Sequence, residues 1–246
     1  MNSSHIYWPL QQKMAITLAY DDALNSQLVN ALPLLNQHGI HATFYLPTDA
    51  ESVRNTPYLW QQASQQGHEL GNHTVHHCCL ASLPNREWVS PSQDLDQYSL
   101  PQIVDEVLEA NIILQQIDGQ TERTFNPPCG DTLINGENYL PLIADQFIAI
   151  RGAEHLPDNF IRYVMPFEQQ HAVDLIELLL DAERAGVQYL NFVFHGVGND
   201  YLSVSVKAHQ DLLSYLSARR EQYWLDSYIN IMRYLQTVDF TRVIAQ

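Results

Sequence analysis

Four histidines fall within the eleven residues Gly67-His68-Glu69-Leu70-Gly71-Asn72-His73-Thr74-Val75-His76-His77. A short strand is expected over 69–72, with Asn72 able to cap the first turn of a following helix. In a helical turn, His73 and His77 share one face, and two ligands to one metal ion can come from such a turn. His76 lies three residues after His73, so spacing leaves the second ligand open between His76 and His77. The stretch therefore predicts a metal site, with a His-rich surface turn as the alternative.

A pair of aspartates, Asp21-Asp22, follows the apolar run Met14-Ala15-Ile16-Thr17-Leu18-Ala19-Tyr20. The run is short, apolar and rich in β-formers, which predicts a buried strand. Charged side chains at the end of such a strand are costly unless they are paired or bind a metal ion. The two carboxylates are therefore candidate site residues rather than packing residues.

Strands and helices alternate along the rest of the chain. Strands are expected at 14–20, 40–46, 69–72, 146–150 and 189–194, with a possible last strand at 222–224, and helices at 23–37, 57–66, 100–117, 173–185, 205–219 and 225–235. This alternation indicates parallel strands covered by helices, an arrangement in which the C-terminal ends of the strands carry the active site. Both polar clusters lie at such ends. With 246 residues, no internal repeat and no linker, the chain is expected to form a single domain over 1–246, with a core at about 14–236.

Composition narrows the classes of partner. The formal net charge is −16 and the sequence pI is about 4.8, so phosphate backbones and anionic lipids are repelled, and neither nucleic acid nor membrane is expected as a partner. No apolar segment is long enough to span a bilayer, and residues 1–12 lack the features of a signal peptide. A cytoplasmic location is expected.

The three cysteines are Cys78, Cys79 and Cys129. An odd number with two adjacent does not indicate a disulfide framework. We interpret them as small buried apolar residues in a reducing compartment, with a thiolate metal ligand as the alternative.

Taken together, four motifs resemble the polysaccharide deacetylase family, which carries the NodB homology domain and includes carbohydrate esterase family 4. They are Leu18-Ala19-Tyr20-Asp21-Asp22, His73-Thr74-Val75-His76-His77, Phe125-Asn126-Pro127-Pro128-Cys129-Gly130 and Phe192-Val193-Phe194-His195. The resemblance implies a distorted (β/α)7 TIM-like barrel. It also implies a divalent metal ion, zinc in the first place, with cobalt, nickel or manganese as alternatives.

The resemblance also assigns roles. Asp22, His73 and His77 would hold the metal, Asp21 would be the general base and His195 the general acid. Two histidines and one carboxylate with an open position form a catalytic rather than a structural zinc set, and a separate acid and base suit hydrolysis near neutral pH. The backbone near Cys129 could help to hold the oxyanion.

The third motif departs from the family pattern. Asn126 stands where the family often has an arginine that holds the catalytic aspartate, and Cys129 replaces the usual Tyr or Phe. Arg151, at the end of a neighbouring expected strand, could substitute for that arginine or could form an ordinary surface salt bridge. Pro128, in the same motif, is a further candidate for contact with the substrate or the oxyanion.

The family's fourth motif is not recognisable, so the residue that orients His195 stays open between Glu154 and Asp158. The long loop 81–99 could wall a substrate cleft. Trp88 in this loop could stack on a sugar ring or pack in the core, and Tyr201 could line the cleft.

These observations support three hypotheses. The first is a metal-dependent deacetylase that acts on an N-acetyl or O-acetyl carbohydrate, with an acetylated oligosaccharide as substrate. The second is an amidohydrolase of the same fold that acts on a small non-sugar amide, such as a cyclic ureide or imide, in a small closed cleft. The third is a non-catalytic sugar-binding protein, which would not require an acid, a base and an open metal site together. The sequence indicates neither the sugar nor the oligomeric state.

Overall fold

The computed structural model of the protein describes residues 8–168 and 170–238. Its centre is a sheet of parallel strands in the spatial order β3-β2-β1-β7-β6, with β8 paired to the start of β1. These strands are β1 (Met14–Asp21), β2 (Thr43–Leu46), β3 (Glu69–Asn72), β6 (Ile161–Val164), β7 (Tyr189–Phe194) and β8 (Tyr223–Leu225); β4 (Leu133–Ile134) and β5 (Glu137–Asn138) form a separate antiparallel pair. The strands expected at 14–20, 69–72 and 189–194 are confirmed, whereas β6 was not predicted.

Beyond β3 the sheet continues through two single bridges. Phe125 bridges Asn72 on one side and Ile150 on the other, both in the parallel sense. Of the strand expected over 146–150, only Ile150 forms a β-bridge, and the short 3-10 helix η4 (Ala144–Gln146) occupies the first residue of the expected range. The five strands β6, β7, β1, β2 and β3, together with the bridged segments at Phe125 and Ile150, make seven parallel segments that follow one another in the described part of the barrel. The predicted distorted (β/α)7 barrel is thereby confirmed.

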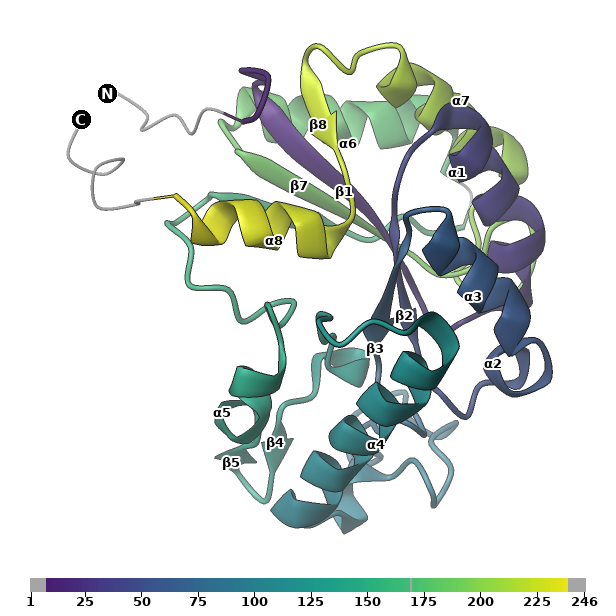
Figure 1. The fold of residues 1–246 in the computed structure, drawn as a ribbon, viewed down its shortest axis with the longest axis vertical. Helices are drawn as coiled ribbons and strands as arrows, with labels where there is room; N and C mark the ends of the chain where they lie inside the picture. Colours follow the sequence, from purple (N-terminus) through teal and green to yellow (C-terminus); the bar gives the residue numbers. More distant parts are fainter. Residues whose placement is uncertain (1–7, 169, 239–246) are drawn as a thin grey trace.

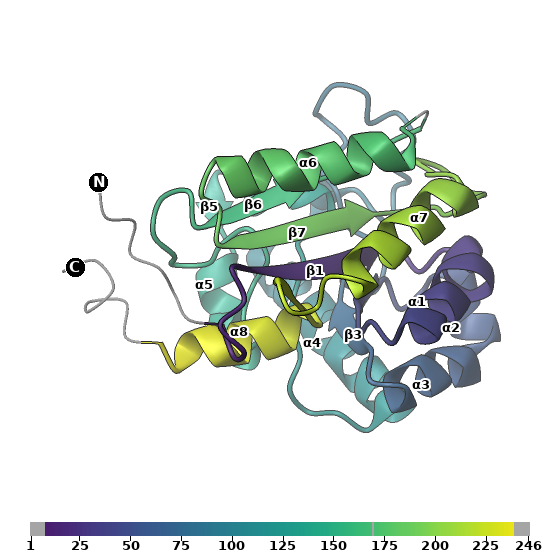
Figure 2. The same cartoon turned by 90° about the horizontal axis from the view of Figure 1, so that it is seen from above.

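Helices cover the outside of the barrel, and Figure 2 shows α6 lying along β6 and β7. The helices are α1 (Leu32–His38), which continues the π-helical turn η1 (Gln27–Ala31), α2 (Glu51–Asn55), α3 (Pro57–Gln65), α4 (Leu100–Asp118), α5 (Leu140–Ile143), α6 (Ala172–Arg184), α7 (Val206–Ser217) and α8 (Tyr228–Gln236), together with the 3-10 helices η2 (Leu95–Gln97) and η3 (Pro128–Gly130) (Figure 1). Within the described residues, no helix combines the length and the apolar character needed to cross a bilayer.

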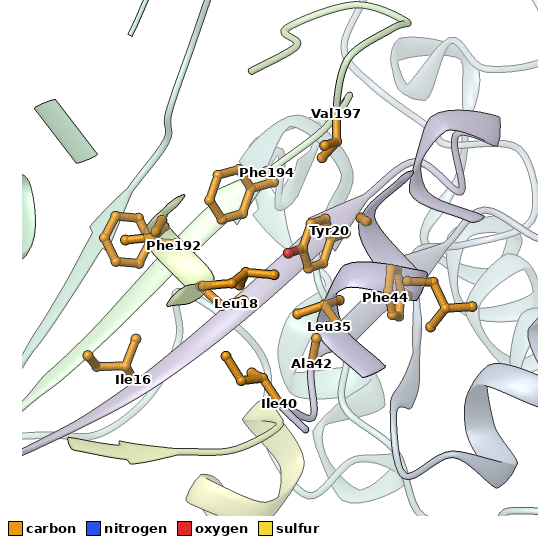
Figure 3. Close-up of a cluster of buried hydrophobic side chains, with 14 of the residues drawn as sticks. Ile16, Leu18, Tyr20, Leu35, Ile40, Ala42, Phe44, Phe192, Phe194 and Val197 are labelled. Atoms are coloured by element: carbon orange, nitrogen blue, oxygen red, sulfur yellow. The ribbon is translucent and has the colours of Figure 1, made fainter. Parts of the chain in front are cut away.

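The alternation of side chains along β1 and β7 separates an outer core from the barrel interior. Successive side chains of a strand point to opposite faces. The outward set of the two strands packs against the covering helices in one apolar cluster (Figure 3); it comprises Met14, Ile16, Leu18, Tyr20, Leu190, Phe192 and Phe194. The inward set therefore has the opposite parity, which places Asp21 and His195 on the same interior face.

Helix α8 begins at the N-terminal ends of β2 and β3, the end of the barrel away from Asp21 and His195. Its residues Tyr228 and Ile231 pack in one cluster with Ala15, Ala19 and Tyr45. Glu69 at the start of β3 is buried there. Its carboxylate accepts hydrogen bonds from the Thr43 and Thr124 hydroxyls and from the backbone N–H of Ile229, which ties α8 to the strands. Burial raises the pKa of Glu69, and these hydrogen bonds offset part of the rise.

One buried histidine predicts how stability depends on pH. His209 on α7 is fully buried, its Nε2 lies 2.6 Å from the Tyr20 hydroxyl, and burial lowers its pKa to about 3, with a smaller contribution from His38. Below about pH 6.5 the unfolded chain takes up a proton that the folded chain does not, so the free energy of unfolding falls as pH falls. From about pH 7 to pH 5 this single group should remove roughly 2 kcal/mol.

The measurement is urea unfolding of the wild type and of His209→Gln at both pH values. The variant is expected to be less stable overall but to lose about 2 kcal/mol less on acidification, because glutamine does not titrate. An equal loss in both proteins would exclude His209 as the source.

Candidate active site

A cavity of about 1090 Å³ lies at the C-terminal ends of the barrel strands. It brings together nearly all of the residues that the sequence analysis selected: Asp21, Asp22, His73, His77, Trp88, Asn126, Cys129, Arg151, His195 and Tyr201. Pro128 is buried and does not line the cavity, whereas the neighbouring Pro127 does. Glu154 and Asp158 do not line it either.

Asp22 and two histidines converge at the floor of this cavity. Oδ1 of Asp22 lies 3.3 Å from Nε2 of His73 and 3.0 Å from Nε2 of His77. Strand alternation alone would point Asp22 away from the interior, but its left-handed φ of 78° ends β1 and turns the carboxylate toward the histidines. His73 is fixed from behind, since its Nδ1 donates to the Asn126 carbonyl at 2.6 Å.

These three side chains fit a divalent metal ion. Oδ1 of Asp22 is buried and, among the described residues, accepts no hydrogen bond of good geometry, although two imidazole nitrogens face it closely. Ligand atoms about 2.0–2.2 Å from a tetrahedrally coordinated zinc ion lie roughly 3.3–3.6 Å apart, which matches the separation from His73, and the separation from His77 is about 0.3 Å shorter. A second-shell carbonyl on a metal-binding histidine is also usual. The donor set is thus suited to zinc or a similar ion.

The protonation states agree with this interpretation. Burial would raise the pKa of Asp22, but the imidazoles of His73 and His77 together lower it well below its ordinary value. Burial lowers the pKa of His73, which outweighs the opposite effect of Asp22. The site therefore favours a carboxylate and a neutral imidazole, the forms that bind metal ions.

The turn that carries the histidines is not helical, so the expected helical turn after Asn72 is wrong. Thr74 and His77 have left-handed φ values of 64° and 58°. Side chains bond the backbone instead: Asn72 Oδ1 accepts from the Thr74 N–H at 2.8 Å, and Thr74 Oγ1 accepts from the His77 N–H at 3.0 Å. Asn72 thus organises a turn in place of a helix start. His76 points to Glu106, with Nδ1 2.5 Å from its Oε1, and not to Asp22.

Arg151 holds Asp21. Its Nη1 and Nη2 donate to Oδ1 and Oδ2 of Asp21 at 3.0 and 2.5 Å, and its Nε donates to the Asn126 side-chain oxygen at 3.0 Å. Asn126 in turn donates to Oδ2 of Asp21 at 3.2 Å. Burial would lower the pKa of Arg151, but the Asp21 carboxylate raises it above the ordinary value. Arg151 is therefore a largely buried partner of Asp21 and does not form a surface salt bridge.

His195 follows β7, the strand that pairs with β1. Its Nε2 is 3.6 Å from Oδ2 of Asp22. Its Nδ1 is buried and has no hydrogen-bond partner among the described residues, so neither Glu154 nor Asp158 orients it. Glu154 instead accepts hydrogen bonds from the hydroxyls of Tyr163 and Tyr228. Among the described residues, no carboxylate therefore holds Nδ1 of His195.

Two exposed aromatic side chains line the mouth of the cavity. Trp88, from the loop 81–99, is 54% exposed, and its ring centroid lies 6.1 Å from that of His77. Tyr201, on the loop after β7, donates its hydroxyl to Oδ2 of Asp22 at 2.8 Å. Burial and the nearby Asp22 raise the pKa of Tyr201, so its hydroxyl stays protonated and can donate. The loop 81–99 therefore forms a wall of the cavity.

The cysteines contradict the interpretation made from their number and spacing. Cys79 and Cys129 form a disulfide across 50 residues, which links the histidine turn to the third motif, and only Cys78 is a free, buried thiol among the described residues. The pairing could not be predicted from the sequence, because no local feature distinguishes Cys78 from its neighbour Cys79.

Two supporting residues were not predicted. Glu106 on α4 accepts from the backbone N–H groups of Val75 and His76 at 3.1 and 3.2 Å. Gln27 on η1 is fully buried and donates to the carbonyls of Asp21 and His195. The sequence feature that could have identified Glu106 and Gln27 is that each lies next to the apolar stripe of its helix, where a polar side chain indicates a buried polar contact.

The sequence is similar to a known protein family. The family profile described as polysaccharide deacetylase matches residues 10–140. A peptidoglycan-N-acetylglucosamine deacetylase of Bacillus cereus is 27% identical over 124 residues, covering 50% of this chain and 39% of that protein. The matches cover about two fifths or less of the length of the curated relatives.

Solved structures share the fold at low identity. The peptidoglycan deacetylase PdaC of Bacillus subtilis superposes with a TM-score of 0.61 at 18% identity, covering 96% of this chain and 98% of that one. BA3943 of Bacillus anthracis, described as a CE4 family pseudoenzyme, superposes with a TM-score of 0.57 at 18% identity, covering 94% and 70%. The profile match covers more than half of the chain and includes Asp21, Asp22, His73 and His77, and on this evidence the chain belongs to the polysaccharide deacetylase family.

Proposed function

We propose that the protein is a metal-dependent hydrolase that removes acetyl groups from an N-acetyl or O-acetyl carbohydrate. One observation carries this proposal. A buried carboxylate and two imidazole nitrogens converge within 3.3 Å at the floor of a large cavity, beside a second carboxylate that is held by Arg151. A site that only bound sugars would not require this combination.

The roles follow from position. Asp21, held by Arg151 and Asn126, accepts the proton of the attacking water as that water adds to the acetyl carbonyl carbon. A bound divalent ion, held by Asp22, His73 and His77, would activate water and polarise the carbonyl. His195 donates a proton to the leaving nitrogen or oxygen as its bond to the acetyl carbon breaks, which gives acetate and a free amine or hydroxyl.

The size and lining of the cavity favour a sugar oligomer over a small cyclic amide. A volume of about 1090 Å³ lies slightly above the usual range for small-molecule pockets, which ends at about 1,000 Å³. Trp88 and Tyr201 at its mouth offer flat apolar faces that can stack on pyranose rings. A ureide or imide would leave most of this space unfilled.

The test is release of acetate from N-acetylglucosamine oligomers and from O-acetylated xylo-oligosaccharides, with a cyclic ureide in parallel. The protein is assayed after chelation and after reconstitution with zinc, cobalt, nickel or manganese. Metal-dependent acetate release from a sugar supports the proposal. Turnover of the ureide alone would favour the amidohydrolase, and sugar binding without turnover under any metal would favour a non-catalytic protein.

Arg151→Ala is expected to lower kcat by about 10²-fold, since loss of the two-pronged contact lets Asp21 move and a displacement of about 1 Å costs this much. Arg151→Lys should recover only part of the rate, because lysine cannot form both hydrogen bonds at once. Steady-state kinetics measure both variants. Arg184→Ala, which removes an exposed arginine on α6, is the matched control, and a wild-type kcat in Arg151→Ala would remove Arg151 from the mechanism.

A further inference from the structure

The ring nitrogen Nδ1 of His77 lies beside the disulfide between Cys79 and Cys129. Nε2 of His77 points to Asp22, and Nδ1 lies 3.7 Å from Sγ of Cys79. His73 differs, because its Nδ1 donates to a backbone carbonyl. The disulfide is thus in direct contact with the proposed metal ligand His77.

One nitrogen and two sulfur atoms that can bind a metal ion lie close together at Nδ1 of His77. Nδ1 of His77 and the Sγ atoms of Cys79 and Cys129 all lie within 4.8 Å of one another. In a tetrahedral zinc site, a sulfur ligand at about 2.3 Å and a nitrogen ligand at about 2.0–2.1 Å are roughly 3.6 Å apart. The distance between His77 Nδ1 and Cys79 Sγ already has this value, and opening the sulfur–sulfur bond would complete the set.

Both cysteine segments are held in place by contacts other than the disulfide. Cys79 pairs with the loop 81–99 through the backbone, donating to the Gln93 carbonyl and accepting from the Leu95 N–H at 2.9 Å each. Asp131, two residues after Cys129, accepts from the Leu80 N–H at 2.8 Å and pairs with Arg86 at 3.4 Å. These contacts keep the two sulfurs near each other after the bond is broken. Cys129 is exposed, so a reductant can reach it.

We propose that reduction of Cys79–Cys129 creates a second zinc site formed by Sγ of Cys79, Sγ of Cys129 and Nδ1 of His77, with water in the fourth position. A dithiol attacks Sγ of Cys129, the sulfur–sulfur bond breaks, and the dithiol leaves as its cyclic disulfide; its two electrons and two protons pass to the cysteine sulfurs. Zinc then displaces both thiol protons and the Nδ1 proton, and His77 bridges two ions. The bridging part rests on the proposed function, whereas the sulfur site does not.

The experiment counts zinc per chain in oxidised protein and in protein reduced with a dithiol that is removed anaerobically before zinc is added. We expect one zinc when oxidised and two when reduced. Cobalt in place of zinc should give sulfur-to-cobalt charge-transfer absorption only after reduction. Cys79→Ser and Cys129→Ser should stay at one zinc, and Cys78→Ser, the matched control, should behave as wild type.

His73→Ala separates the two sites, because it removes a ligand of the first and none of the second. Reduced His73→Ala should bind one zinc and keep the cobalt–sulfur absorption, and oxidised His73→Ala should bind none. A single zinc in reduced wild type without that absorption overturns the sulfur site and leaves the proposed function intact. No zinc in oxidised wild type contradicts the proposed function alone, and circular dichroism that shows unfolding on reduction also overturns the sulfur site.

Discussion

Oxidised His73→Ala is expected to bind no stoichiometric zinc and to lose the proposed deacetylase activity by about 10⁴-fold. His73 is buried and supplies one of the three atoms that converge on the floor of the cavity. With only Asp22 and His77 left, the site has fewer protein ligands than a catalytic zinc site normally uses. Stabilisation of the transition state by the ion is worth several kcal/mol, and each 1.36 kcal/mol corresponds to about tenfold in rate.

Zinc bound per chain and acetate release are measured on the same preparations. His76→Ala is the matched control for metal, because His76 pairs with Glu106 rather than with Asp22 and its loss should leave one zinc bound. Thermal unfolding checks that the small cavity left by alanine does not unfold the chain. Full zinc occupancy in His73→Ala would show that the three side chains are not the ligand set.

Asp21→Asn is expected to lower kcat by about 10²- to 10⁴-fold while it leaves the bound metal unchanged. General base catalysis by a positioned side chain contributes this range. Asparagine is close to the size of aspartate and can still accept a hydrogen bond from Arg151, but it cannot take up the proton of the attacking water. Asp21 is not one of the three side chains that would hold the metal, which are Asp22, His73 and His77, so zinc should stay bound to Asp21→Asn.

This pair of variants separates the two carboxylates. Asp22→Asn should reduce zinc affinity as well as rate, whereas Asp21→Asn should reduce rate alone. A rate within a few fold of wild type in Asp21→Asn would assign the base to another group, and loss of metal from it would mean that the two adjacent aspartates share the ligand role.

The bonds that hold Asp21 could not be predicted from nearby sequence. Arg151 lies 130 residues from Asp21, on a segment reduced to a single bridge at the barrel edge. Residues on strands that are not adjacent meet only after the strands have paired and the sheet has curved, so no local pattern identifies which arginine faces which carboxylate. The same holds for Cys79 and Cys129, whose partnership depends on the distance between two loops at the end of the barrel.

The sequence by itself determined the parallel α/β class and the position of the candidate site residues, and the resemblance of four motifs to a known family added the expectation of a barrel. Apolar runs and their periods of 2 and 3.6 are local properties, and they place Asp21, Asp22, His73, His77 and His195 at strand ends. Tertiary structure alone decided the shape of the histidine turn, the partner of Asp21 and the disulfide. Each depends on contacts between distant segments, such as the bonds from Glu106 on α4 to the backbone of Val75 and His76, and those contacts form only when the helices pack on the closed sheet.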